Sequence, residues 1–178
     1  MTLHDHDDEP RYCTRCGGPL IATRLKTTEP ERPVCSLCGR VVYLDPKVAV
    51  GTIIKNAQHE IALVRRSIEP GYGKWVFPGG YVDRGELLVS AAKREALEES
   101  RLHIRIDGLV NIYSYAGRIP VIIVYAATHV GGELHADDES LEAQWYATRD
   151  LPWSELAFPS TRDGLRDYLN GILHPHVV

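Results

Sequence analysis

Three glutamates, Glu95, Glu98 and Glu99, have the spacing that most directly indicates chemistry in this sequence. Residues three and four positions apart share one face of an α-helix. Residues 86–100 contain no Pro or Gly and consist mostly of good helix formers, so we expect a helix there. Ionised carboxylates that share a face need a partner, and a hard divalent cation with oxygen ligands, Mg²⁺ or Mn²⁺, is the natural one.

An amphipathic helix over 86–100 would turn its acidic side chains inward. Its apolar stripe consists of Leu87, Leu88, Ala91 and Ala92. At about 100° per residue, Glu95 and Glu99 fall in the middle of that stripe and Glu98 falls at its edge. The alternative is a solvated acidic face that pairs with Lys93 and Arg94, but charged faces normally lie opposite the apolar stripe. The pattern therefore favours a metal site over a surface feature.

The same stretch resembles the signature of the Nudix hydrolase family, G-x5-E-x7-R-E-U-x-E-E-x-G-U, in which U is a bulky aliphatic residue. The matching positions are Gly80, Glu86, Arg94, Glu95, Glu98, Glu99 and Leu102. Two positions depart from the signature, because Ala96 is smaller than the usual aliphatic residue and Arg101 replaces a Gly. A Gly there would end the helix in the left-handed conformation, which costs a non-Gly residue roughly 1–2 kcal/mol.

The resemblance implies an α/β fold, an α/β/α sandwich with a mixed sheet. It also implies Mg²⁺- or Mn²⁺-dependent attack of water on a nucleoside diphosphate linked to a group X, which releases a nucleoside monophosphate and a phosphorylated X. The implied metal ligands are Glu95, Glu98, Glu99 and the carbonyl oxygen of Gly79. Arg94 would orient a ligand carboxylate, and Glu86 would support the motif. Some relatives take the general base from the motif, and others take it from a later loop, where Glu139 is the candidate and Glu142 the substitute.

Four cysteines form a second chemical pattern. Cys13 and Cys16 make one C-x2-C pair, Cys35 and Cys38 make another after 18 intervening residues, and a Gly follows each pair. This spacing is typical of a zinc ribbon, and four thiolates complete a tetrahedral Zn²⁺ shell with no position left for a reacting water. A disulfide framework is the alternative, which a reducing setting disfavours. We expect structural Zn²⁺ that supplies the folding free energy of this segment.

The identity of the group X is not determined, and several substrates are candidates. Ribbon-bearing relatives include NADH pyrophosphatases, whose S-Q-P-W-P-F-P stretch is missing here, whereas residues 45–48 resemble the branch that acts on ADP-ribose and FAD. We expect ADP-ribose or FAD as substrate; NADH or NAD hydrolysis and a non-hydrolysing nucleotide-sensing module are the alternatives. Arg65 and Arg66 are neighbours in an expected strand, so one of them could reach a substrate phosphate. The aromatic residues that could stack on a ring, or equally belong to the core, are Tyr72, Tyr113, Tyr115, Trp153 and Phe158.

Hydrophobic patterning predicts the scaffold around these residues. Strands are expected at 48–54, 61–66, 75–80, 110–115, 121–128 and 144–147, with an acidic loop at 137–142. A last helix should begin near Ser160, with Asp163 as a capping residue. Its expected apolar face consists of Leu165, Tyr168, Leu169 and Ile172. The expected domains are a disordered tail at 1–10, a zinc ribbon at 11–45 and a Nudix hydrolase domain at 46–178.

Composition and charge are those of an ordinary globular protein. The chain has 178 residues, 44% hydrophobic and 25% charged, and a net charge of −4. Residues 11–47 carry seven bases and three acids, an excess too small to indicate nucleic-acid binding, although a ribbon that contacts nucleic acid is an alternative. We find no secretory signal and no apolar run of membrane-spanning length, so we expect a cytoplasmic protein that acts on a small nucleotide derivative. The oligomeric state stays open, with a homodimer as one option.

Overall fold

The structure, a computed structural model, describes residues 10–137 and 140–175. The chain divides into two compact units between Asp45 and Pro46, and each unit has its own sheet. The expected tail at 1–10 lies outside the described residues except for Pro10. Among the described residues, no helix combines the length and the apolar character that crossing a membrane requires.

The first unit contains a two-stranded antiparallel sheet. Its strands are β1 (Leu20–Thr23) and β2 (Arg32–Cys35), and Leu20 lies opposite Cys35. Three of the four residues of β1 are exposed, including Ile21. So little burial cannot hold a segment of this size together, so its stability must come from the cysteines.

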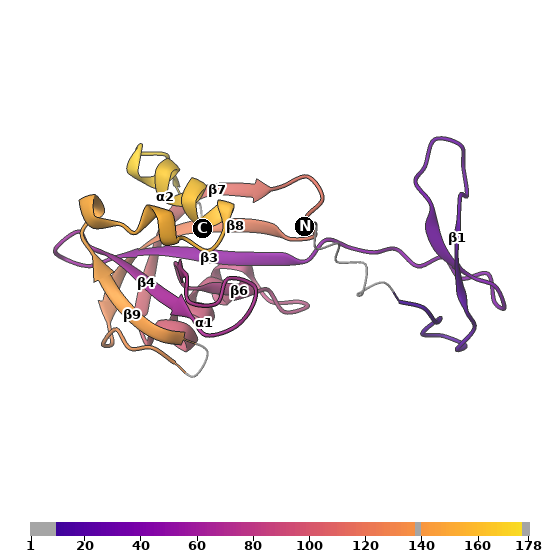
Figure 1. Ribbon diagram of the computed structural model, residues 1–178, viewed down its shortest axis with the longest axis horizontal. Coiled ribbons are helices and arrows are strands. Elements are labelled where there is room, and N and C mark those ends of the chain that lie inside the picture. Colours follow the sequence, from indigo (N-terminus) through magenta and orange to yellow (C-terminus); the bar gives the residue numbers. More distant parts are fainter. Residues whose placement is uncertain (1–9, 138–139, 176–178) are drawn as a thin grey trace. The chain divides into compact units, whose positions relative to one another are not determined.

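The second unit is built on an eight-stranded sheet (Figure 1). Its elements are β3 (Val48–Lys55), β4 (Ile61–Arg66), β5 (Trp75–Val76), β6 (Gly79–Tyr81), α1 (Leu88–Ser100), β7 (His103–Ser114), β8 (Val121–Gly131), β9 (Ser140–Tyr146), α2 (Pro159–Leu169) and β10 (His174–Pro175), with two 3₁₀ turns at Thr148–Asp150 and Trp153–Glu155. The strand order is β10-β7-β8-β3-β4-β5, with β6 paired to β3 and β9 paired to β4.

Parallel pairing of β3 and β8 forms the centre of the sheet. Eight residue pairs run from Val48 opposite Val121 to Lys55 opposite Thr128. The other strand pairs are antiparallel, so the predicted mixed sheet is confirmed. Most of β3 is buried and apolar on both faces, as expected for a strand that helices cover on both sides.

The two helices cover opposite faces of the sheet, and Figure 1 shows α2 on one side and α1 on the other. Leu165 of α2 packs in a core cluster with Ile53 of β3. Ala91 and Ala92 of α1 pack in a different cluster with Val50, which is three residues before Ile53 and so points to the other face. This arrangement is the predicted α/β/α sandwich.

The last helix differs from the prediction in how it begins and in what it buries. Its N-cap is Phe158, with no side-chain capping bond, and Asp163 instead accepts a hydrogen bond from the Tyr115 hydroxyl at 2.8 Å. Leu169 is exposed, and Ile172 lies beyond the end of the helix. The predicted capping role and the outer part of the predicted apolar face are therefore wrong, because the helix turns polar residues toward β7.

Strand β7 is longer than predicted, starting at His103 rather than at 110. Its first half carries charged residues, including Arg105, which is exposed and forms an ion pair with Asp107 at 3.2 Å. Pairing with β8, which itself continues to Gly131, holds this half in the sheet. Hydrophobic patterning did not predict this half of the strand, because its exposed face carries polar residues.

Candidate active site

The inward face of α1 is made of small residues. Ala91, Ala92 and Ala96 are fully buried, which lets the helix lie close to the sheet. The helix begins at Leu88, two residues later than predicted, because a turn precedes it in which the Glu86 N–H donates to the Asp83 carbonyl at 3.0 Å. Leu87 is the N-cap in extended conformation and is 74% exposed, so its predicted place in the apolar stripe is wrong.

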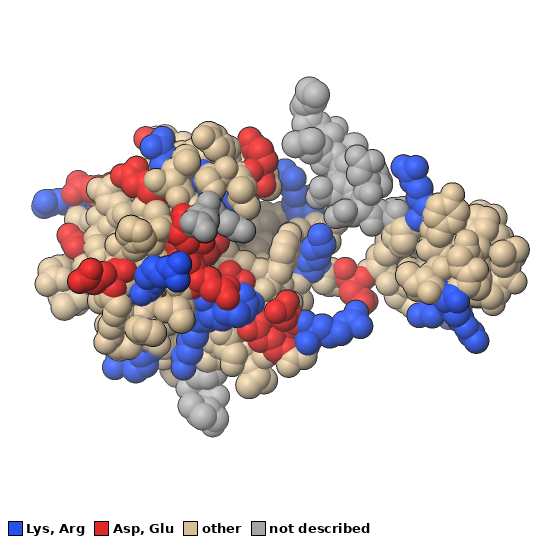
Figure 2. Space-filling model, turned by 90° about the horizontal axis from the view of Figure 1, so that it is seen from below, with Lys and Arg blue, Asp and Glu red and all other residues tan. Residues whose placement is uncertain are grey.

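The three glutamates of α1 are not equally buried. The side chain of Glu95 is only 12% exposed and that of Glu98 is 56% exposed, and Glu99 is also partly buried. On this side of the second unit, acidic and basic side chains lie next to one another in one group (Figure 2). The helix therefore carries its carboxylates from the border of the core to the surface.

The guanidinium of Arg94 holds this group together. It donates to Glu95 at 2.7 Å, to Glu98 at 2.9 Å, and to both carboxylate oxygens of Glu86 at 2.9 and 2.8 Å. It also donates to the carbonyl of Tyr81 in β6 at 3.1 Å. The hydrogen bonds from Arg94 lower the pKa of Glu86 to about 2, so Glu86 is a fixed negative charge. One cation thus ties the turn before α1, the helix and strand β6 together.

The Gly79–Gly80 pair lets the backbone approach the carboxylates closely. The Gly79 N–H donates to the Glu99 carboxylate at 2.8 Å. A Cβ built on Gly80 would lie 2.6 Å from the carboxylate atoms of Glu95, closer than any real side chain tolerates. A side chain at position 80 would push the Glu95 carboxylate out of its present place, whereas a Cβ at Gly79 would clash with the backbone carbonyl oxygen of Val50, so position 79 is the one that requires glycine.

Glu99 has the most perturbed carboxyl group of α1. Burial, with smaller contributions from the negative charges of Glu95 and Asp137, raises the pKa of Glu99 to about 7. The Gly79 N–H and the positive charge of Arg66 act in the opposite direction. Burial also raises the pKa of Glu95. With a pKa of about 7, about half of the Glu99 carboxyl groups carry a proton at pH 7. A bound cation would stabilise the ionised form that burial disfavours.

We expect Glu99→Gln to stabilise the metal-free protein at alkaline pH. Between its ordinary pKa of 4.5 and the folded value of about 7, Glu99 binds more protons in the folded state than in the unfolded state. Stability therefore falls as pH rises through this window, by up to about 3 kcal/mol, and the Gln variant escapes that loss. Thermal unfolding in chelator should give a Tm difference that is larger at pH 8 than at pH 5. An equal or lower Tm for the variant at pH 8 would contradict this reading.

Arg101, at the end of α1, stands where the signature described above has a glycine. Arg101 adopts the left-handed conformation, with φ of 60°, and its N–H donates to the Leu97 carbonyl at 3.0 Å. Leu102 is fully buried directly after it. The helix therefore ends as a glycine-capped helix would, at the conformational cost that an arginine carries there.

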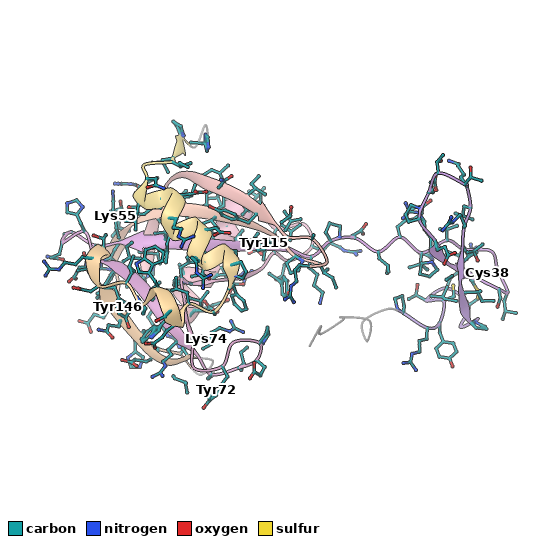
Figure 3. All side chains as sticks on the ribbon, turned by 45° about the horizontal axis from the view of Figure 1, so that its top comes forward. Cys38, Lys55, Tyr72, Lys74, Tyr115 and Tyr146 are labelled. Carbon is teal, nitrogen blue, oxygen red and sulfur yellow. The ribbon has the colours of Figure 1, made fainter. Side chains whose placement is uncertain are left out.

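Arg66 is held by the loop that follows β4 and by Phe158, the residue before α2. Its Nε donates to the Pro70 carbonyl at 2.9 Å, and its guanidinium lies 5.1 Å from the centroid of the Phe158 ring. Its charge acts on the pKa of Glu99. Tyr72 lies on the loop between β4 and β5 and is exposed (Figure 3). Of the predicted substrate contacts, Arg66 is the one whose charge acts on a carboxyl group of α1.

Arg65 points elsewhere and is already engaged. Its Nε donates to the Gly73 carbonyl at 2.8 Å, and its Nη1 lies 3.7 Å from the carboxylate of Glu142. Glu142 belongs to β9 rather than to the predicted acidic loop, which ends where that strand begins at Ser140. A β-strand places Glu142 opposite Arg65 in the register and explains the pair.

The acidic loop before β9 reaches the site through a residue that the sequence did not single out. Glu139, the predicted later base, lies outside the described residues. Asp137, the last described residue before it, contributes a negative charge that raises the pKa of Glu99. The run of acids at 137–139 was the available signal, but spacing could not show which of them faces α1.

The predicted aromatic stackers Tyr113 and Tyr115 belong to the core on the α2 side. Tyr113 is 9% exposed and its hydroxyl donates to Asp167 at 2.7 Å, and Tyr115 makes the matching bond to Asp163. Figure 3 shows Tyr115 next to α2. Trp153 packs against the same cluster. The structure therefore gathers these three residues around α2 and not around the carboxylates of α1.

The oxygen atoms of Glu95, Glu98 and Glu99 and of the Gly79 backbone suit a hard divalent cation. Carboxylates and carbonyls are the ligands of Mg²⁺ and Mn²⁺, and the missing side chain of Gly80 leaves the Glu95 carboxylate against the backbone turn. Among the residues described, only the four thiols already lie within metal-binding distance of one another. The carboxylates would therefore have to turn from their present hydrogen bonds to converge on an ion.

The four cysteines of the first unit fit a tetrahedral metal. All four are free, and their sulfur atoms lie within 4.8 Å of one another. The Sγ atoms of Cys13 and Cys38 are 3.8 Å apart and those of Cys16 and Cys35 are 3.4 Å apart, close to the roughly 3.8 Å edge of a Zn–S tetrahedron. These distances exclude the alternative of disulfides, whose sulfur atoms bond at about 2 Å.

Comparison with known families decides what this arrangement is. A model described as NUDIX domain matches residues 45–168, and a zinc-ribbon model described as Nudix N-terminal matches residues 11–44. The chain belongs to the Nudix hydrolase family. It is a Nudix pyrophosphatase with the N-terminal four-cysteine segment of that family.

Individual relatives agree with this assignment. The ADP-ribose pyrophosphatase of Methanocaldococcus jannaschii is 36% identical over 132 residues, 72% of this chain and 76% of that protein. The NAD-capped RNA hydrolase NudC of Edwardsiella ictaluri is 29% identical over 143 residues, and the chain spans about half of its length, 53%. A solved NUDIX hydrolase from Nitrosomonas europaea matches with a TM-score of 0.85 and 29% identity over 94% of this chain and 97% of that chain.

Proposed function

We propose that this Nudix protein hydrolyses the diphosphate bond of ADP-ribose or FAD in the presence of Mg²⁺ or Mn²⁺ and releases AMP. The observation that carries the proposal is that Glu95, Glu98 and Glu99 share one side of α1, with the partly buried Glu99 carboxylate hydrogen-bonded to the Gly79 N–H and its pKa raised by burial to about 7. Similarity to a protein named ADP-ribose pyrophosphatase supports the choice of substrate.

The proposed ion site uses Glu95, Glu98, Glu99 and the carbonyl oxygen of Gly79. When bound there, a divalent ion supplies neutralisation of the diphosphate charge and acidification of a coordinated water. Arg94 holds Glu95 and Glu98 through its two hydrogen bonds and so orients the ligand carboxylates. Glu86, with its lowered pKa, fixes Arg94 in turn.

The proposed reaction breaks one bond and forms one. The oxygen of a water molecule bonds to one phosphorus of the diphosphate, the bridging oxygen leaves that phosphorus, and a carboxylate accepts a proton from the water. ADP-ribose gives AMP and ribose 5-phosphate, and FAD gives AMP and FMN. Glu139 is the proposed base from outside the motif, because Glu142, the other acid considered, is paired with Arg65.

Arg66 is the proposed phosphate contact. A guanidinium whose charge already acts on Glu99 lies near the ligand carboxylates. Arg66 lies over the Phe158 ring and donates from Nε to the Pro70 carbonyl. The two terminal nitrogens of its guanidinium could then donate to an anion. Its positive charge would offset part of the phosphate charge.

NAD or NADH is a second candidate substrate. The similarity to NudC, a protein named NAD-capped RNA hydrolase, favours it. The same diphosphate bond would be hydrolysed, and the two products would be AMP and nicotinamide mononucleotide. The two candidates differ only in the group that follows the second phosphate.

A substrate panel with identified products tests the proposal. Purified protein with Mg²⁺ or Mn²⁺ should release AMP from ADP-ribose or FAD faster than from NADH or a dinucleoside polyphosphate. Chromatography of both products identifies the bond that was broken. Release of AMP from none of them would overturn the proposal, and tight ADP-ribose binding without products over hours would indicate a nucleotide-sensing module instead.

A further inference from the structure

A cavity of about 550 Å³ opens between the beginning of β3 and the beginning of α1. Its apolar lining includes Val48, Val82 and Leu88, and its polar lining includes Lys47, Asp83 and Arg84. The cavity is shallow and largely open to solvent, and it combines apolar walls with a few polar groups, as small-molecule sites do. None of these residues has a place in the chemistry proposed above.

The ring of Tyr81 forms one wall of this cavity. It is 53% exposed although its backbone is paired with β3 in the sheet. The ammonium group of Lys47 lies 5.4 Å from the centroid of the ring. A tyrosine face next to a cation is suited to an aromatic ring that carries oxygen atoms or is joined to a phosphate.

Hydrogen bonds of Arg94 link the strand that carries Tyr81, at the cavity, to the carboxylates of α1. The guanidinium that donates to the Tyr81 carbonyl at 3.1 Å also donates to Glu95 and Glu98. Leu88 at the cavity precedes Glu95 by seven residues, about 10 Å along the helix axis. A diphosphate held at the carboxylates could therefore extend a sugar and a ring into the cavity.

The rim of the cavity is held in place before any ligand arrives. The Asp83 N–H donates to the Glu86 carboxylate at 3.0 Å, and the Glu86 N–H donates back to the Asp83 carbonyl at 3.0 Å. Arg94 clamps the same carboxylate. A rim that is already ordered binds a ligand with little further loss of conformational entropy.

We propose that this cavity binds the aromatic ring of the group X in a diphosphate-linked dinucleotide, such as the flavin of FAD or the nicotinamide of NADH. Tyr81 stacks on the ring, and Lys47 and Arg84 contact oxygen atoms of the ring or of the adjoining phosphate. The inference rests on the proposed function and deepens it by assigning a place to X. ADP-ribose, whose X ends in a sugar, does not use the stacking surface.

The ratio of two KM values tests the assignment. Tyr81→Ala should raise KM for FAD by about tenfold relative to KM for ADP-ribose, because stacking on an aromatic side chain contributes on this scale. Tyr81→Phe keeps the ring and should keep the ratio of the wild type. Lys47→Gln should also raise KM for FAD relative to KM for ADP-ribose, but by a smaller factor than Tyr81→Ala does. Lys93→Gln, which removes a charge from an exposed position of α1 outside the cavity, should leave the ratio unchanged.

Two results would overturn the assignment. An equal rise of KM for both substrates in Tyr81→Ala would mean that the cavity holds the adenosine half or only supports the fold. KM values that do not change for either substrate would mean that X binds elsewhere. Thermal unfolding of each variant separates a loss of folding from a loss of binding.

A flavin titration keeps this test independent of catalysis. FMN added to metal-free protein should lose fluorescence on stacking, and Tyr81→Ala should weaken the apparent affinity by about tenfold. If the wild type hydrolyses no substrate but binds FMN in this way, the proposed function fails and the cavity assignment stands. If it hydrolyses FAD but neither the KM ratio nor the FMN affinity responds to Tyr81, the cavity assignment alone fails.

Discussion

Replacing Glu98 or Glu99 with Gln is expected to lower kcat for diphosphate hydrolysis by about a thousandfold or more, because each change removes a negative ligand from the proposed ion site. Glutamine keeps the size and the hydrogen-bonding ability of the side chain. The side chain of Glu98 is more than half exposed and accepts one hydrogen bond from Arg94, so its loss should leave the fold intact. Initial rates with ADP-ribose or FAD over a Mg²⁺ titration measure the effect.

A matched control separates the ligand role from a general effect of charge. Glu155→Gln removes an exposed carboxylate from the short turn before α2 and should leave both kcat and the Mg²⁺ dependence unchanged. Circular dichroism and Tm check that each variant folds. Retention of more than about a tenth of wild-type activity by Glu98→Gln and by Glu99→Gln would show that the carboxylates of α1 do not bind the required ion.

We propose that the four cysteines hold a structural Zn²⁺, and we expect removal of this ion or of one of its ligands to unfold the first unit. Structural Zn²⁺ sites contribute binding free energies on the order of 10 kcal/mol, and this unit has little buried apolar surface to replace them. Cys35→Ser should lower the zinc content from one ion per chain to none and make residues 11–45 sensitive to protease. The second unit has its own core and should keep its far-ultraviolet spectrum.

The pH dependence of zinc binding gives a further check on the same site. Hydrogen bonds from the Cys38 and Leu37 backbone N–H groups to the thiolate lower the pKa of Cys35 to about 6. Although a hydrogen bond from the Gly18 backbone N–H acts to lower it, contacts with the neighbouring thiols raise the pKa of Cys16 to about 12. Zinc affinity should therefore fall as pH drops through the neutral range, and fall more steeply below 6, where Cys35 also gains a proton. Thr14→Ala changes an exposed residue between two ligands and should bind zinc as the wild type does. A Cys35→Ser variant that keeps its zinc and its protease resistance would rule out the tetrahedral site.

Local signals in the sequence were sufficient for much of the fold. The cores of β3 and β4 and the body of α1 were predicted because their apolar residues follow the period of their element. Hydrophobic patterning failed where packing partners decide the outcome. β7 is held by pairing with β8 despite its charged residues. Asp163 bonds Tyr115 instead of capping α2, because the helix begins at Pro159 and Asp163 lies inside it.

What the sequence determined by itself was the chemical inventory: three carboxylates and an arginine on one helix, a glycine pair before it, and four thiols at ribbon spacing. These follow from covalent order and helix period, which act over a few residues. Only the tertiary structure decided which groups meet across the chain. It set Arg66 and Asp137 near Glu99, engaged Arg65 with Glu142, and opened a cavity beside Tyr81, because such contacts depend on strand register and burial between segments far apart in sequence.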